Sequence, residues 1–168
     1  LKPIYYNENK GSAQCKSSII FAGMRTEGTT LIKAKKSRNH TELMCKYLNL
    51  PISIKSNKKF DYIKIKKIKK IIPLNYEIPS DISSSAFFIV LTALTKNSEL
   101  IIRNVNINKS RIGIITILKK MGIKIVFKNQ KTYKGEKKAD IKVVSAKNIK
   151  AINCPPELNS GAIDEFLV

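Results

Sequence analysis

The sequence has few of the residues from which metal and disulfide sites are built. Its three cysteines are widely spaced and odd in number, no CxxC motif occurs, and the one histidine, His40, has no cysteine near it. We therefore expect neither a zinc site nor a disulfide framework, and reduced thiols are typical of the cytoplasm. No GxGxxG or GxxxxGK[ST] motif is present, which argues against the common nucleotide-binding folds.

Long apolar runs are also missing. No stretch approaches the roughly 18 apolar residues of a membrane-spanning helix, and no signal peptide is visible. Leu1 stands first in place of methionine, and residues 162–168 stop within an apolar pattern, so we expect a fragment of a longer protein. Hydrophobic residues make up 43% of the chain, which is enough for a packed core.

Acidic residues are scarce: 32 lysines and arginines stand against 12 aspartates and glutamates, a formal net charge of +20. Such a charge is typical of nucleic-acid-binding proteins, but the lysine- and isoleucine-rich composition of an AT-rich genome would give it too. The densest basic run, residues 63–70, partly alternates Ile with Lys, as a half-buried strand does. No aromatic platform for stacking bases is interleaved with it. We favour solvated basic faces, which would still attract small anionic substrates.

The periodicity of the apolar residues predicts two copies of one α-β-α-β-β unit. When the halves are aligned, residues 31–33 fall over residues 101–103, and Arg38 falls over Arg111. Chance recurrence of common α/β elements is the alternative, but order, spacing and the arginine coincide. The predicted helices cover residues 12–23, 37–48, 82–94 and 109–121, and the predicted strands cover residues 29–34, 51–55, 61–67, 98–105, 122–127 and 139–145.

Two of these elements carry more detailed predictions. Ser37 is a candidate cap for the second helix. The apolar face of that helix is formed by Leu43, Tyr47 and Leu48, with Met44 at its edge. A polar loop at residues 128–138 separates the last two strands, and residues 73–85 fit either a connection between domains or an ordinary loop.

The first predicted helix opens on small polar residues, "GSAQCKSS", at residues 11–18. A helix start carries unpaired N–H groups and partial positive charge, so it is either capped or able to bind an anion. Ser12 suits the cap. Ser12 and Ala13 are also small enough for a phosphate to approach the backbone, and Gln14 both donates and accepts hydrogen bonds. The residues alone leave both interpretations open.

Two motifs in this half, "SAQCKS" at residues 12–17 and "SRNHTE" at residues 37–42, resemble the 5-enolpyruvylshikimate-3-phosphate synthase family. Its glyphosate-insensitive members carry SAQxKS and then S/T-R-D-H-T-E. "EIPSDISSSAFF", "ITILKKMGIKI" and "IDEF" match further motifs in the same order, so the resemblance covers essentially the whole chain. Asn39 replaces the usual Asp, and Ser80 replaces a Gly, but neither position is an expected ligand.

The resemblance implies an α/β (α+β) fold of repeated βαβαββ units in the two-domain enolpyruvyl transferase arrangement, with only part of each domain present. Residues 1–77 would belong to the domain that binds the first substrate, shikimate 3-phosphate. Residues 78–168 would belong to the second domain, after a hinge crossing near residues 76–80.

The family transfers the enolpyruvyl group of phosphoenolpyruvate to the 5-hydroxyl of shikimate 3-phosphate and releases phosphate, a step of aromatic amino acid biosynthesis through chorismate. By resemblance, Ser12 and Ala13 would hold the 3-phosphate, Gln14 would contact both substrates, and Arg38 would help neutralise the phosphate. Asp164 would bind the shikimate hydroxyls and accept the proton of the attacking one.

The resemblance also implies that no metal or organic cofactor takes part. The partners would be the two anionic substrates, with no nucleic acid and no membrane, and the full-length protein would be a cytoplasmic monomer. Because the motifs that supply most phosphoenolpyruvate contacts lie outside the chain, we expect these 168 residues alone to be inactive.

Each residue also has a purely structural interpretation. Ser12 would then only cap its helix, Arg38 would pair with Glu42 four residues on, and Asp164 with Glu165 would be carboxylates favoured at a helix start. Three alternatives remain, and one is a non-catalytic structural repeat, which would need no anion site at Ser12. The sister enzyme that uses UDP-N-acetylglucosamine shares the fold, but the two motifs argue against it. A basic RNA-binding α/β repeat would bind RNA with a steep salt dependence.

Overall fold

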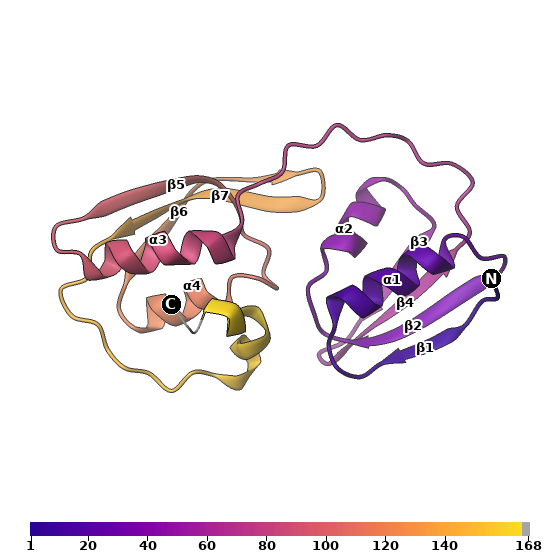
Figure 1. Ribbon diagram of the computed structural model, residues 1–168, viewed down its shortest axis with the longest axis horizontal. Helices are drawn as coiled ribbons and strands as arrows, with labels where there is room; N and C mark the ends of the chain where they lie inside the picture. Colours follow the sequence, from indigo (N-terminus) through magenta and orange to yellow (C-terminus); the bar gives the residue numbers. More distant parts are fainter. Residues whose placement is uncertain (166–168) are drawn as a thin grey trace. The chain divides into compact units, whose positions relative to one another are not determined.

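The computed structural model describes residues 1–165, except for the side chains of residues 157, 159, 160 and 164. The chain forms two compact units, Leu1–Asn75 and Tyr76–Val168 (Figure 1). The assignment of residues 1–77 and 78–168 to two substrate domains stays a prediction. No helix among residues 1–165 is long and apolar enough to cross a membrane.

The first unit has the order β-α-β-α-β-β. Its elements are β1 (Tyr5–Glu8), α1 (Ala13–Gly23), β2 (Thr29–Lys35), α2 (His40–Tyr47), β3 (Ile52–Ser56) and β4 (Phe60–Lys66). The sheet order is β1-β2-β4-β3, with β1 parallel to β2 and the other neighbours antiparallel. Periodicity alone does not reveal β1, because its one fully buried residue is the polar Glu8.

The second unit repeats this order. Its elements are α3 (Ile82–Leu94), β5 (Glu99–Asn106), α4 (Gly113–Lys120), β6 (Lys124–Tyr133), β7 (Glu136–Val144) and the 3-10 helices η1 (Pro156–Gly161) and η2 (Ile163–Glu165). The sheet order β5-β7-β6 matches β2-β4-β3. Ser80 forms a parallel bridge to Val105 of β5, in the place that β1 takes beside β2. The predicted repeat is therefore confirmed, with a first strand reduced to one residue.

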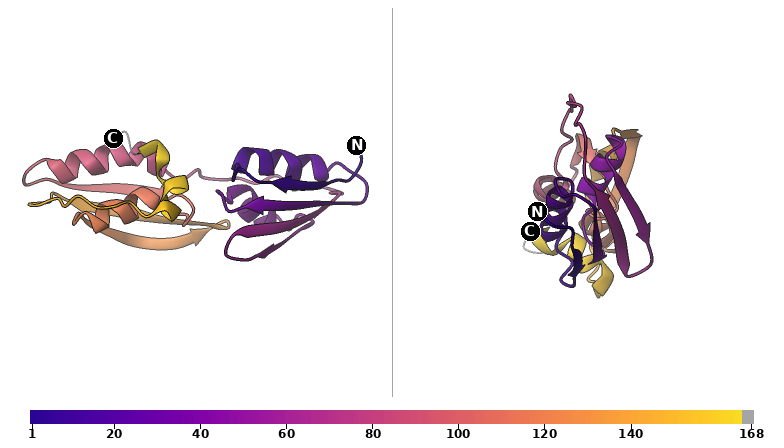
Figure 2. Two further views of the ribbon diagram at one scale, coloured as in Figure 1. Left: turned by 90° about the horizontal axis from the view of Figure 1, so that it is seen from below. Right: turned by 90° about the vertical axis from the view of Figure 1, so that its right-hand side faces the viewer.

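In each unit the two α-helices lie over one face of the sheet (Figures 1 and 2). The hydrophobic core lies between the helices and the sheet. Ile63 and Ile65 of β4 are completely buried against Ile20 of α1, whereas Lys64 and Lys66 point away. The alternation predicted for the basic run therefore holds within β4. Burial of these isoleucines supplies about 25 cal/mol per Å² of apolar surface.

The prediction for α2 is wrong in two details. The helix begins at His40, after Asn39, so Ser37 is not its cap. Its buried residues are Glu42 and Cys45, whereas Tyr47 is 43% exposed. An eight-residue helix packs through a narrow stripe, and here that stripe includes a carboxylate that an apolar pattern cannot predict.

The polar loop predicted at residues 128–138 is wrong as well. β6 and β7 extend through it to a tight turn at Lys134 and Gly135, where φ is +47° and +88°. Two central residues with positive φ are typical of the type I′ hairpin turn. Residues 129–132 are exposed, so backbone pairing rather than apolar burial holds this end of the hairpin, and periodicity gives no signal there.

The helix α3 keeps a wide apolar face uncovered in this chain. Phe87, Phe88, Leu91 and Leu94 are each at least 60% exposed. Exposed apolar surface of this kind is what we expect of a piece of a larger domain, and contiguous patches promote association.

Candidate functional site

The start of α1 is formed by Ser12, Ala13 and Gln14. Ser12 is the N-cap residue, and its Oγ accepts a hydrogen bond of 3.2 Å from the backbone N–H of Cys15. The hydroxyl therefore still has its hydrogen to donate. The N–H groups of Ala13 and Gln14 precede the helical ladder. Ser12 and Ala13 are half-buried and Gln14 is exposed, so this corner combines several donors with access from solvent.

The loop before α1 is held from within by Glu8, at the end of β1. This carboxylate is 3% exposed and accepts hydrogen bonds of 2.8 Å from the N–H groups of Lys10 and Gly11. Burial raises the pKa of Glu8, but the N–H groups of Ser12, Gly11 and Lys10 and the charge of Lys16 lower that pKa below its usual value. An external anion would therefore be held by residues 12–14, while Glu8 fixes the loop beneath them.

Arg38 lies in the same unit, two residues before the start of α2, and is half-buried. Two contacts join α1 to α2 just beyond the two predicted halves of the site. Ser17 Oγ lies 2.7 Å from Thr41 Oγ1. Lys16 Nζ lies 2.6 Å from Glu42 Oε1, with side-chain exposures of 0% and 5%.

The equivalent corner of the second unit, at the start of α3, is filled by the protein's own carboxylate. Asp81 is the N-cap residue and accepts from the N–H of Ser84 at 2.9 Å. Arg111 donates to Asp81 Oδ1 at 2.8 Å and to Ser83 Oγ at 2.6 Å. Burial raises the pKa of Asp81, but the Ser84 hydrogen bonds and the Arg111 charge lower that pKa overall. The second unit thus shows how a helix start and this arginine bind an anionic group.

Asp164 lies in η2 of the second unit, and its side chain falls outside the described residues. The segment that carries it is fixed at two points. The buried Glu165 accepts a hydrogen bond from Ser83 of α3. A Cβ on Gly113 of α4 would meet the backbone of Gly161 at 2.8 Å, so the start of α4 and the end of η1 require glycine at position 113 for their close approach.

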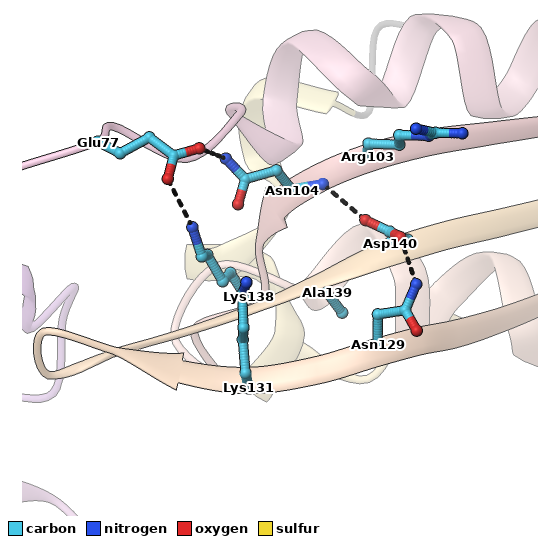
Figure 3. A pocket seen from close by; sticks show the side chains of 8 residues that line it. All are labelled: Glu77, Arg103, Asn104, Asn129, Lys131, Lys138, Ala139 and Asp140. Carbon is cyan, nitrogen blue, oxygen red and sulfur yellow. Dashed lines mark hydrogen bonds and ion pairs between the residues drawn. The ribbon is translucent and has the colours of Figure 1, made fainter.

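A hollow of about 420 Å³ lies on the sheet of the second unit and contains none of the predicted site residues (Figure 3). Its carboxylates are satisfied internally. Glu77 accepts from Asn104 Nδ2 at 3.0 Å and pairs with Lys138, and Asp140 accepts from the N–H of Asn104 and from Asn129 Nδ2. These contacts attach Glu77 to the second unit, and the hinge predicted at residues 76–80 remains a prediction.

Among the described residues no metal cluster occurs, and the buried thiol of Cys45 is not activated. The described residues contain no group of three His, Cys, Asp or Glu side chains that would hold a metal ion. Burial, and then the Glu42 charge, raise the pKa of Cys45 to about 11, which keeps this thiol protonated.

The structure thus places Ser12, Ala13, Gln14 and Arg38 in one unit and Asp164 in the other. Glu8 and the Lys16–Glu42 pair were not predicted as supports of the site. No pattern within one helix identifies the pair, because its two members lie on different helices and Arg38 precedes α2.

Comparisons with known proteins bear on this site. Residues 1–158 match the family described as EPSP synthase (3-phosphoshikimate 1-carboxyvinyltransferase). The 3-phosphoshikimate 1-carboxyvinyltransferase of Hydrogenovibrio crunogenus is 40% identical over 173 residues, which cover 100% of this chain and 38% of that protein. The solved EPSP synthase from Acinetobacter baumannii superimposes with a TM-score of 0.86 and 36% identity, over 99% of this chain and 37% of that one.

A more distant structure shares the fold alone. The enolpyruvyl transferase NikO from Streptomyces tendae matches with a TM-score of 0.60 at 16% identity, covering 88% of this chain and 36% of that chain. The chain therefore spans well under half the length of the proteins it matches.

Proposed function

The chain belongs to the EPSP synthase (3-phosphoshikimate 1-carboxyvinyltransferase) family, and on that premise we propose that it carries the shikimate 3-phosphate half of such an enzyme's site. The enzyme would transfer the enolpyruvyl group of phosphoenolpyruvate to the 5-hydroxyl of shikimate 3-phosphate and release phosphate. The observation that carries the proposal is the start of α1, where Ser12 caps the helix without bringing a carboxylate into the corner.

The proposed roles follow from the donors on each residue. The Ser12 hydroxyl and the N–H groups of Ala13 and Gln14 would bind the 3-phosphate, since a helix start favours an anion. Arg38 would add a planar, permanently charged donor that suits a bidentate contact with phosphate. The Gln14 side chain would reach both substrates.

Asp164 is proposed as the general base. The 5-hydroxyl oxygen of shikimate 3-phosphate would attack C2 of phosphoenolpyruvate as its proton passes to the Asp164 carboxylate. The resulting tetrahedral intermediate then loses phosphate. The attachment of η2 to α3 through Glu165 and Ser83 supports this role, because a general base must be held within hydrogen-bond reach of the proton it removes.

The chain alone would not complete the reaction. It spans about 38% of the length of the Hydrogenovibrio relative, and the remaining residues of the full-length protein would supply most phosphoenolpyruvate contacts. We propose that this protein acts as a cytoplasmic monomer without a cofactor, and that the isolated 168 residues give no steady-state turnover.

The test uses the full-length polypeptide that contains these residues. It would be mixed with shikimate 3-phosphate and phosphoenolpyruvate, and phosphate release would be followed beside Gln14→Ala, Asp164→Ala and the matched control Gln130→Ala on exposed β6. Release that Gln14→Ala and Asp164→Ala abolish and Gln130→Ala preserves is expected. Equal activity in all variants would contradict the proposed site.

Two other outcomes would replace the proposal. Turnover of UDP-N-acetylglucosamine in place of shikimate 3-phosphate would assign the sister activity. Absence of phosphate release, together with tight RNA binding that weakens steeply with salt, would show that the net charge of +20 was the functional signal.

A further inference from the structure

The buried pair formed by Lys16 and Glu42 has no place in the reaction as proposed. Its members come from the two helices whose starts carry the site, and both side chains are almost completely enclosed. No described residue gives Lys16 Nζ or either carboxylate oxygen of Glu42 a hydrogen bond, so charge attraction alone joins the two side chains. An ion pair with so few partners recovers little of the cost of removing two charges from water.

Stability alone therefore does not explain the pair. Replacement of a buried ion pair by apolar side chains of similar volume is often neutral or stabilising. What an apolar contact lacks is charge: two opposite charges 2.6 Å apart in a buried site attract each other, and this attraction joins α1 to α2 at one defined point.

The two residues sit one helical turn beyond the two halves of the site. Lys16 follows Ser12 by four positions, and its N–H donates to the Ser12 carbonyl at 3.1 Å. Glu42 follows Arg38 by the same four positions, in the first turn of α2. The pair therefore links the start of α1, just behind Ser12, to the first turn of α2, which begins two residues after Arg38.

In the second unit the helix start and the arginine are connected by a different contact. There Asp81 and Arg111, the equivalents of Ser12 and Arg38, bind each other directly at 2.8 Å. The equivalents of Lys16 and Glu42 are Ser85 and Ile115, both buried and neither charged. In the second unit the helix start and the arginine contact each other directly, and no ion pair is present at the deeper positions of Ser85 and Ile115. In the first unit, where we propose that the corner binds an anion, the charged contact between the two helices is made by Lys16 and Glu42, behind the helix starts.

We propose that Lys16 and Glu42 are a positioning pair that holds residues 12–14 in register with Arg38 for one phosphate group. The inference rests on the proposed function, because it needs shikimate 3-phosphate as the ligand of that corner. Neither residue touches the substrate, and both act through the backbone of the helices that carry the ligands.

The test compares wild-type full-length protein with the apolar pair Lys16→Met/Glu42→Met. Calorimetry would give the Kd for shikimate 3-phosphate, steady-state kinetics would give kcat and KM, and thermal unfolding would give Tm. We expect Tm near that of the wild type, kcat at saturation little changed, and Kd and KM for shikimate 3-phosphate raised about tenfold or more, the effect of losing one hydrogen bond to a charged group.

Controls separate positioning from folding. The surface pair Lys142–Glu99, also 2.6 Å apart, changed to Met/Met should leave the Kd unchanged. Should Lys16→Met/Glu42→Met fail to fold, Lys16→Leu/Glu42→Gln, which also leaves no buried charge, should give the same rise in Kd with Tm preserved. A folded variant of either kind with wild-type Kd and KM overturns the inference. Wild-type protein that binds no shikimate 3-phosphate overturns the proposed function and this inference together.

Discussion

The starts of α1 and α3 occupy equivalent places in the two units, yet one is closed by a carboxylate and the other is not. At α3, Asp81 caps the helix and binds Arg111. At α1, Ser12 caps the helix with a neutral hydroxyl. The same topology and the same arginine position therefore produce an internally neutralised corner in one unit and a corner that favours an anion in the other.

The two corners differ in the side chain of the N-cap residue, which is Ser12 at α1 and Asp81 at α3. We infer that this difference separates a ligand-binding helix start from a purely structural one. A helix start needs an acceptor for its N–H groups, and either a side chain or a ligand can provide it. In the second unit the acceptor is a side chain of the protein, the Asp81 carboxylate, so the start of α3 has a structural role. In the first unit the capping side chain is the neutral Ser12 hydroxyl, and predictions about these two corners should therefore diverge.

The largest effect is expected from Ser12→Asp, which gives α1 the cap of α3. The helix should be capped as well as before, but a carboxylate would face the incoming phosphate. Two like unit charges 4 Å apart near a protein surface repel by about 4 kcal/mol, so affinity for shikimate 3-phosphate should fall more than about a hundredfold. Calorimetric titration of the full-length polypeptide measures this loss.

Ser12→Asn is the matched control, because asparagine caps a helix as well as aspartate does and carries no charge. It should retain most of the affinity that Ser12→Asp loses. Equal Kd values for Ser12→Asp and wild type would mean that no phosphate binds at α1.

The two arginines should respond in opposite ways. Arg38→Ala should lower the affinity for shikimate 3-phosphate by about tenfold to a hundredfold, since a hydrogen bond to a charged group contributes ~1.5–3 kcal/mol. Arg111→Ala should leave that affinity unchanged and instead lower the free energy of unfolding, because Asp81 and Ser83 lose their donor. Calorimetric binding and urea unfolding measured on both variants would test this. Loss of shikimate 3-phosphate affinity in both variants would contradict the proposed difference between the two units.

The repeat and the cap at Ser12 could be predicted from the sequence because each rests on local chemistry: apolar periodicity and a small polar residue before a helix. The buried face of α2 could not, since Glu42 is buried only because Lys16 of another helix meets it. The short strand β1 and the support from Glu8 were missed for a related reason. A buried carboxylate whose partners are backbone N–H groups leaves no pattern in side-chain hydrophobicity.

A smaller effect is expected from Asp81→Ala. The variant removes the cap of α3, and loss of a capping side chain costs about 1 kcal/mol. The ion pair with Arg111 adds little, because the Asp81 side chain is 50% exposed. Urea unfolding should show the loss, and phosphate affinity in the first unit should stay as in the wild type. A larger fall in affinity than in stability would show that the two corners are coupled.

The smallest effect concerns pH and distinguishes two carboxylates, Glu8 in the loop before α1 and Asp81 at the cap of α3. Both have a pKa lowered by folding, so each contributes stability that is present above its unfolded pKa and is lost as pH falls through its folded pKa. Glu8→Gln and Asp81→Asn should each flatten the decline of unfolding free energy on acidification below about pH 4. Glu8→Gln should also weaken phosphate binding at neutral pH, because the Glu8 carboxylate accepts the backbone N–H hydrogen bonds that hold the loop before Ser12, whereas Asp81→Asn should not. Equal affinity of the two variants for shikimate 3-phosphate would show that Glu8 contributes to stability and not to phosphate binding.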